Sequence, residues 1–187
     1  INAGLAVSTA PYVVLSNSDT EVKTNGWLEK MAEPFDRYEN LAAVGPCTDN
    51  IGYPVGRREE FPLNQGFIAL KPCHTQSGWG FDVKMSFWCV MLRREAILDV
   101  GYLDENFSPG LGEDDDWLYR SYLKGWTAGV QTDVFVKHLG GASWPSREER
   151  DRIQKRNVEY LKKKYPQVSA KALVAGFLTG TLSRPPW

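Results

Sequence analysis

The feature that most constrains the fold is a short apolar run that ends abruptly in polar residues near the start of the chain. Residues 12–15 are apolar and include two β-branched valines, which predicts a buried strand. Small residues at helical spacing over 2–10 predict a helix before that strand. A helix followed by a buried strand predicts an α/β fold, in which helices flank a mixed, mainly parallel sheet.

The later pattern extends this layered arrangement. Helices are expected at 26–38, 94–100, 113–124 and 146–164, and strands at 41–44, 85–92 and 127–136. The last helix is expected to begin with a capping box, in which Ser146 is the N-cap and Glu149 is its partner. Prolines and glycines interrupt residues 45–84, which predicts a long loop region of the kind that forms binding sites.

Composition excludes several functional classes. A chain of 187 residues that is 42% hydrophobic and has a net charge of −1 fits one domain without the basic field that nucleic acid attracts. No apolar run approaches the roughly 20 residues of a membrane span. Three widely spaced cysteines, Cys47, Cys73 and Cys89, indicate reduced structural thiols. We therefore expect a cytoplasmic protein.

Polar residues follow the first strand directly. Asn17 and Asp19 stand where ligands bind in open α/β sheets, beyond the carboxyl end of a strand. Their oxygens could bind a hard divalent cation, with diphosphate and water as the other ligands. The structural alternative is a turn capped by either side chain.

A second acidic group lies at the start of an expected helix. Residues 113–116 are Glu113 and three aspartates, more acids than capping a helix requires. Mutual repulsion is expected to raise the pKa of at least one of them, which suits it to accept a proton near neutral pH. The alternative is a solvated helix start in which Asp116 pairs with Arg120.

His138 ends an apolar strand and precedes a glycine pair. A neutral imidazole at this position could complete an oxygen-rich metal site. The alternative is a histidine that only forms a hydrogen bond at the start of a loop.

In this order, the motifs resemble family 2 glycosyltransferases of the GT-A fold over most of the chain, from Asn2 to about Ser143. The resemblance is carried by ordered segments at 2–4, 12–20, 26–28, 90–96, 100–107, 112–116 and 138–143, with Arg120 and Gly125. Each segment is short, and their order and spacing together carry the assignment.

The resemblance implies an inverting transfer of sugar from a nucleoside-diphosphate donor to an acceptor hydroxyl. It implies that Asn17 and Asp19 are a DxD-type motif, that Asp19 and His138 bind Mn²⁺ or Mg²⁺, and that Asp114, or else Glu113, is the base. The implied acceptor is a glycan, a lipid-linked molecule or a protein, as in polysaccharide biosynthesis, and a homo-oligomer is compatible with this assignment. Trp79, Phe81 and Trp88 are expected near the acceptor, although Trp88 also suits the core.

The implied domain organisation is one domain over 1–187. Its parts are the metal motif in 1–44, an acceptor loop region in 45–84, the acidic catalytic part in 85–144, and a C-terminal helix and tail in 145–187. Family members begin with a nucleoside-binding segment, which this sequence is expected to lack.

Two alternatives remain. The first is a calcium- or carbohydrate-binding domain, because Asp104, Asn106 and Ser108 have the spacing that begins a calcium loop, with Asp115 at its twelfth position. The second is a pseudoenzyme that keeps the fold and has lost catalysis.

Overall fold

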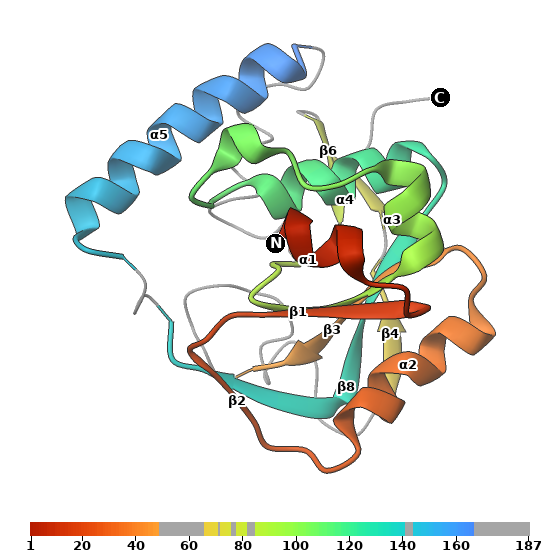
Figure 1. The fold of residues 1–187 in the computed structure, drawn as a ribbon. Coiled ribbons are helices and arrows are strands. Elements are labelled where there is room, and N and C mark those ends of the chain that lie inside the picture. Colours follow the sequence, from red (N-terminus) through yellow and green to blue (C-terminus); the bar gives the residue numbers. More distant parts are fainter. Residues whose placement is uncertain (49–65, 71, 76–77, 82–84, 141–143, 167–187) are drawn as a thin grey trace.

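The computed structural model describes residues 1–48, 66–70, 72–75, 78–81, 85–140 and 144–166, with the backbone alone for 72–75 and 78–81. Within these ranges the helices are interspersed with groups of one, two or five strands along the chain (Figure 1). The helices are α1 (Asn2–Val7), α2 (Trp27–Arg37), α3 (Arg94–Val100), α4 (Glu113–Leu123) and α5 (Arg147–Lys164), with a 3-10 turn at Glu105–Phe107. The strands are β1 (Tyr12–Ser16), β2 (Thr20–Val22), β3 (Leu41–Cys47), β4 (Phe67–Ala69), β5 (Pro72–Thr75), β6 (Gly78–Phe81), β7 (Cys89–Arg93) and β8 (Thr127–His138).

The main sheet has six strands and is mixed. Its order is β1-β7-β3-β8-β2, with β4 also paired to β8. Among the described strands only β3 and β8 run parallel, and the other pairings are antiparallel. The expectation of a mainly parallel sheet is therefore wrong. The apolar runs indicated that the central strands are buried on both faces. Helices also cover both faces of this mostly antiparallel sheet, so burial did not reveal the direction of the strands.

Both faces of the sheet are buried, as the alternation along β7 shows. Cys89 and Met91 face the cluster that α2 covers, whereas Val90 and Leu92 face the cluster beneath α3 and α4. Figure 1 shows α2 on one side of the sheet and α1, α3 and α4 on the other. The helices thus leave one end of the sheet, where β1 ends and β2 begins, for the polar residues.

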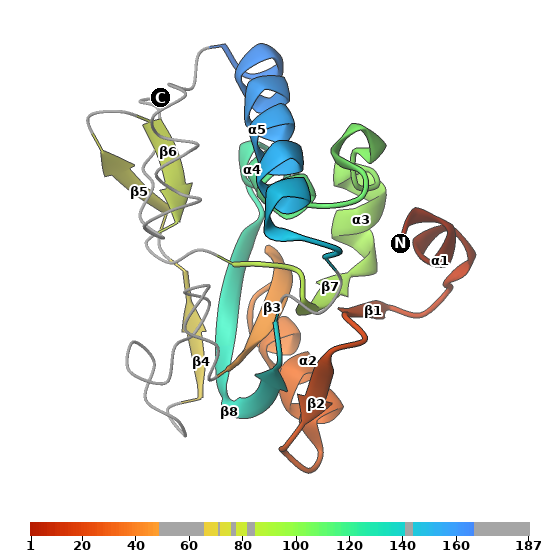
Figure 2. The same ribbon diagram turned by 90° about the vertical axis from the view of Figure 1, so that its left-hand side faces the viewer.

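All five expected helices form. The region 45–84 is more ordered than expected, because its described part contains β4, β5 and β6. Figure 2 shows the two-stranded β5–β6 sheet set apart from the main sheet, on the side of the molecule opposite α1. The side chains of Trp79 and Phe81 lie outside the described residues. None of the helices in the described ranges is long and apolar enough to cross a membrane.

Candidate functional site

One cavity of about 840 Å³ brings together the residues predicted to bind the metal and the diphosphate and to act as the base. Asn17 and Asp19 line it from the β1–β2 connection, Glu113 and Asp114 from the start of α4, and His138 from the end of β8. Residues far apart in the sequence therefore line the same cavity. The lining is completed by Ile1, Ser86, Phe87, Trp88, Pro109, Gly110, Leu111, Gly112, Leu139, Gly140, Trp144, Pro145, Glu149, Arg150 and Ile153.

Strand pairing brings Asp19 to His138. Thr20, the first residue of β2, pairs with His138, the last residue of β8. The backbone oxygen of Asp19 then accepts a hydrogen bond from Leu139 N at 3.0 Å. As a result, Asp19 Oδ1 lies 3.4 Å from His138 Nε2, and both side chains are more than nine-tenths buried.

Trp88 fixes the plane of the imidazole. Its ring stacks on His138 with centroids 4.9 Å apart and an interplanar angle of 8°. The backbone oxygen of Trp88 accepts a hydrogen bond from Asn17 N at 2.7 Å, which also holds the end of β1 in place. Trp88 thus belongs to the core, as its burial shows, and also forms part of the cavity wall.

The donor set of this wall fits a hard divalent cation. Asp19 Oδ1 is buried and has no hydrogen-bond partner among the residues that the structure describes. A buried carboxylate oxygen that accepts no hydrogen bond is costly, and a cation would relieve that cost. The described ranges contain no group of three or more His, Cys, Asp or Glu side chains that could hold a metal ion. Two protein ligands suit an ion whose other ligands are phosphate and water.

Asp114 is held by three donors. Ser86 Oγ donates to Asp114 Oδ2 at 2.7 Å, and the backbone N–H of Phe87 donates to the same oxygen at 3.3 Å. The backbone N–H of Asp115 donates to Asp114 Oδ1 at 2.9 Å. The carboxylate is therefore fixed in orientation at the cavity wall and is 7% exposed.

Asp116 differs from the two acids of α4 that line the cavity. Asp116 points away from the cavity and is fully buried, where Arg120 Nε donates to its Oδ2 at 2.9 Å. Lys164 Nζ and Tyr165 Oη both lie 2.6 Å from its Oδ1. The Asp116–Arg120 pair of the structural alternative is therefore present, but Asp116 is buried and not part of a solvated helix start. Glu113 and Asp114 are the two acids of this turn that line the cavity.

Lys164 competes with the calcium ion that the calcium-loop alternative would place beside Asp104. Lys164 Nζ lies 2.6 Å from Asp104 Oδ2, and Tyr160 Oη donates to the same oxygen at 2.8 Å. Asn106 donates to Asp104 Oδ1. The carboxylate that would begin a calcium loop is therefore already neutralised by a lysine.

Sequence reasoning missed several cavity residues. Ser86, which orients Asp114, carried no signal because it lies in a segment expected to be a strand, whereas β7 begins at Cys89. Trp144 and Arg150 come from the connection to α5 and from its first turns. Only the fold shows that this part of the chain returns to the cavity.

Comparison with known proteins gives one family. The family model described as glycosyl transferase family 2 matches residues 1–99, which is more than half of the chain. The match includes Asn17 and Asp19 and ends before Glu113, Asp114 and His138. A comparison with curated proteins found no match.

Proposed function

The chain belongs to glycosyl transferase family 2, and on that premise we propose that it transfers a sugar, with inversion, from a nucleoside diphosphate to an acceptor hydroxyl. The observation that supports this proposal is the shared cavity. Asp19 and His138 lie on the wall formed by β2 and β8, and Asp114 lies on the wall formed by α4. A metal-binding pair and a fixed carboxylate in one cavity are the two elements that such a transfer requires.

Asp19 and His138 are the residues that would hold Mn²⁺ or Mg²⁺ on the donor diphosphate. When bound, the ion supplies positive charge that stabilises the departing nucleoside diphosphate. Asn17 belongs to the same turn and lines the cavity beside Asp19, so its amide is available to the diphosphate. Stacking on Trp88 holds the imidazole plane before the ion arrives, which lowers the entropic cost of assembling the site.

Asp114 is the proposed base. Its Oδ2 accepts hydrogen bonds from Ser86 and from Phe87 N, while its Oδ1 accepts one, from Asp115 N. Oδ1 therefore retains a lone pair that can take the proton of the acceptor hydroxyl. Glu113 lies on the same wall and is the second candidate.

The rest of the cavity has an apolar side. Leu111, Trp144 and Ile153 line it together with two prolines. Apolar side chains in the lining suit the apolar face of a sugar ring. The proposed acceptor is accordingly a glycan, a lipid-linked molecule or a protein that presents a hydroxyl to Asp114.

To test the proposed transfer, the protein in its natural length is incubated with Mn²⁺ and a panel of UDP-, GDP- and dTDP-sugars. Release of nucleoside diphosphate is measured with and without mono- and disaccharide acceptors. We expect Mn²⁺-dependent release from at least one sugar nucleotide, and loss of that release with EDTA. Failure of every donor in the panel to release nucleoside diphosphate would contradict the proposal.

A further inference from the structure

Helix α5 places a buried polar side chain against the loop that precedes Glu113 and Asp114. The inner stripe of α5 consists of Ile153, Asn157 and Leu161, spaced four residues apart. Two of these residues are apolar, as a core-facing stripe requires, and the third is an asparagine that is 1% exposed. A buried amide in such a stripe needs partners, and its partners lie in the loop.

Asn157 places its amide nitrogen within hydrogen-bonding distance of three backbone carbonyl oxygens. Its Nδ2 lies 2.7 Å from Gly110 O, 2.8 Å from Leu111 O and 3.1 Å from Phe107 O. Its Oδ1 accepts a hydrogen bond from Arg156 Nε at 2.9 Å, so the orientation of the amide is fixed. Because an amide nitrogen carries two hydrogens, one of them is shared between two of these carbonyls.

The backbone of this loop includes an unfavourable conformation that such hydrogen bonds can stabilise. Leu111 has a φ of 75°, a left-handed conformation that costs a leucine free energy, and Gly110 and Gly112 also have positive φ. Carbonyls that converge in this way repel one another unless a donor lies between them. Asn157 supplies that donor.

The path of the loop determines where the acidic pair lies. Gly112 is the N-cap residue that directly precedes α4, and its carbonyl accepts the hydrogen bond of Asp116 N at 3.0 Å. Glu113 and Asp114 follow directly. A shift of the Gly110–Gly112 backbone would therefore move both carboxylates relative to Asp19 and His138, on the other wall of the cavity.

We propose that Asn157 is a positioning residue, which holds the Phe107–Leu111 carbonyls so that Glu113 and Asp114 face the cavity in the geometry needed for proton transfer. This inference rests on the proposed function. Displacements of about 1 Å in a catalytic group can lower rates about 100-fold. Asn157 is not among the described residues that line the cavity, so in this proposal it acts through the loop.

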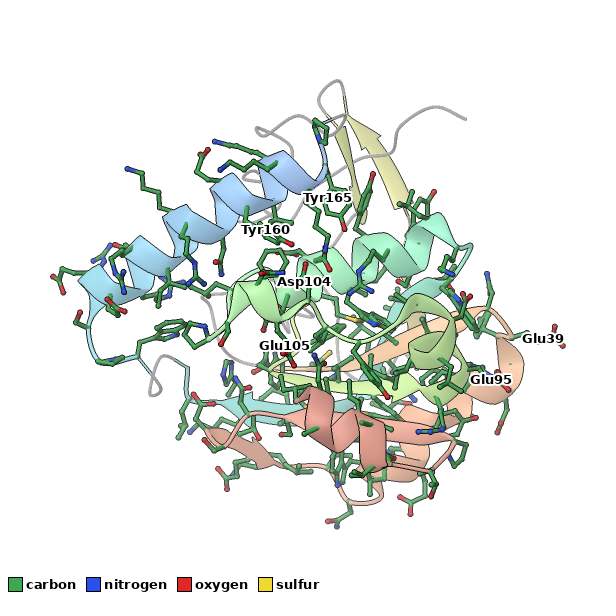
Figure 3. All side chains as sticks on the ribbon, turned by 45° about the horizontal axis from the view of Figure 1, so that its top comes forward. Glu39, Glu95, Asp104, Glu105, Tyr160 and Tyr165 are labelled. Atoms are coloured by element: carbon green, nitrogen blue, oxygen red, sulfur yellow. The ribbon has the colours of Figure 1, made fainter. Side chains whose placement is uncertain are left out.

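Other contacts of α5 provide a matched control. Tyr160 Oη donates to Asp104 Oδ2, and Asp104 also bonds Lys164 and Asn106. Figure 3 shows Tyr160 on α5 close to Asp104, on the segment before α4. Tyr160→Phe thus weakens the attachment of α5 and leaves the three carbonyl contacts of Asn157 intact.

The experiment compares Asn157→Asp, Asn157→Ala and Tyr160→Phe with the unmodified protein. Asn157→Asp keeps the shape and replaces the donor by an acceptor, and Asn157→Ala removes the donor without adding charge. One readout is hydrogen exchange of backbone amides in residues 109–116 and in residues 150–164. The other is kcat and KM for the sugar nucleotide that the unmodified protein turns over fastest.

We expect both Asn157 variants to exchange at least 10-fold faster over 109–116, with α5 itself changed less than 3-fold. We expect kcat to fall about 100-fold while the donor KM stays within 3-fold, and Tyr160→Phe to retain kcat within 3-fold. Equal acceleration of exchange in α5 and in the loop, or an equal loss of kcat in Tyr160→Phe, would show a merely structural role and overturn the inference. An unmodified protein that turns over no donor refutes the proposed function instead, and the exchange readout then decides alone whether Asn157 holds the loop.

Discussion

His138 Nε2 lies 3.4 Å from Asp19 Oδ1, across the junction of β2 and β8. The pairing of Thr20 with His138 creates this relationship, so it follows from the sheet and not from flexible loops. Trp88 stacks on the imidazole from within the core. One residue of the proposed metal-binding pair therefore ends a strand and the other directly precedes one, where the geometry is more rigid than it would be on a long loop.

Asp114→Asn tests the proposed base. The amide keeps the size of the side chain and cannot take a proton, so we expect kcat to fall about 10²- to 10⁴-fold. Binding of Mn²⁺ with nucleoside diphosphate, measured by calorimetry, should remain within 3-fold. Asp115→Asn is the control, because it removes the same charge from the same helical turn, and Asp115 is not among the described residues that line the cavity. Equal losses in both variants would contradict the assignment.

Asp104 links stability to pH. Burial raises its pKa, but donation by Lys164, Asn106 and Tyr160 outweighs this and lowers the pKa below its ordinary value of 3.8. A carboxyl with a lowered folded-state pKa stabilises the fold above its unfolded pKa and loses that contribution as the pH falls further. We expect Asp104→Asn to reduce the dependence of the unfolding free energy on pH below about 4, as measured by urea denaturation at pH 2.5 to 6. An unchanged slope would contradict this account.

Gly129→Ala tests the pairing of β4 with β8. A Cβ at this position would lie 2.1 Å from the Phe67 ring and 2.8 Å from the carbonyl oxygen of Ile68. The ring would have to move and the backbone of β4 would have to shift, so we expect a loss of about 1–3 kcal/mol in unfolding free energy. Thermal denaturation measures it, with Gly4→Ala as the control, because a Cβ there meets nothing within 4 Å. A Gly129→Ala protein as stable as the control would show that β4 lies elsewhere.

The buried thiols should be unreactive in the folded protein. Burial raises the pKa of Cys47 to about 12, with a further contribution from Asp133, and burial raises that of Cys89 to about 11 against the opposing hydrogen bond of Ser16. The thiolate is the reactive form, so we expect little alkylation of either residue at pH 8. Mass spectrometry of peptides labelled with iodoacetamide, before and after unfolding in urea, measures this. Rapid labelling of Cys47 or Cys89 in the native protein would contradict their placement.

The local pattern predicted the elements well where burial decides them. The apolar run at β1, the helical spacing of α4 and the Ser146 N-cap, which accepts from Glu149 N at 3.1 Å, were all readable from the sequence. The direction of the strands was not readable, because parallel and antiparallel strands buried on both faces carry similar apolar runs. The expected capping box is only half formed. Ser146 accepts from Glu149 N, but the Glu149 carboxylate accepts hydrogen bonds from Arg152.

The sequence indicated which residues would meet at one cavity, whereas it did not indicate the residues that support them. Glu113, Asp114 and His138 stood out as acids or as a histidine at element ends, and the structure places them in one cavity. Ser86 and Asn157 act through contacts between distant segments, which no local pattern encodes. The one signal for Asn157 was an amide between Ile153 and Leu161 on an otherwise apolar stripe.

We propose that Asp19 and His138 bind a divalent cation together with the donor diphosphate. The most direct test of this binding is calorimetric titration of Mn²⁺ into the protein with and without UDP, GDP or dTDP. We predict one Mn²⁺ site that at least one nucleoside diphosphate strengthens, weakened at least 10-fold in Asp19→Asn and in His138→Asn. Glu21→Gln, which removes a nearby exposed charge paired with Lys23, should bind Mn²⁺ as the unmodified protein does. Unchanged Mn²⁺ affinity in Asp19→Asn, or a site that no nucleoside diphosphate strengthens, would contradict the account.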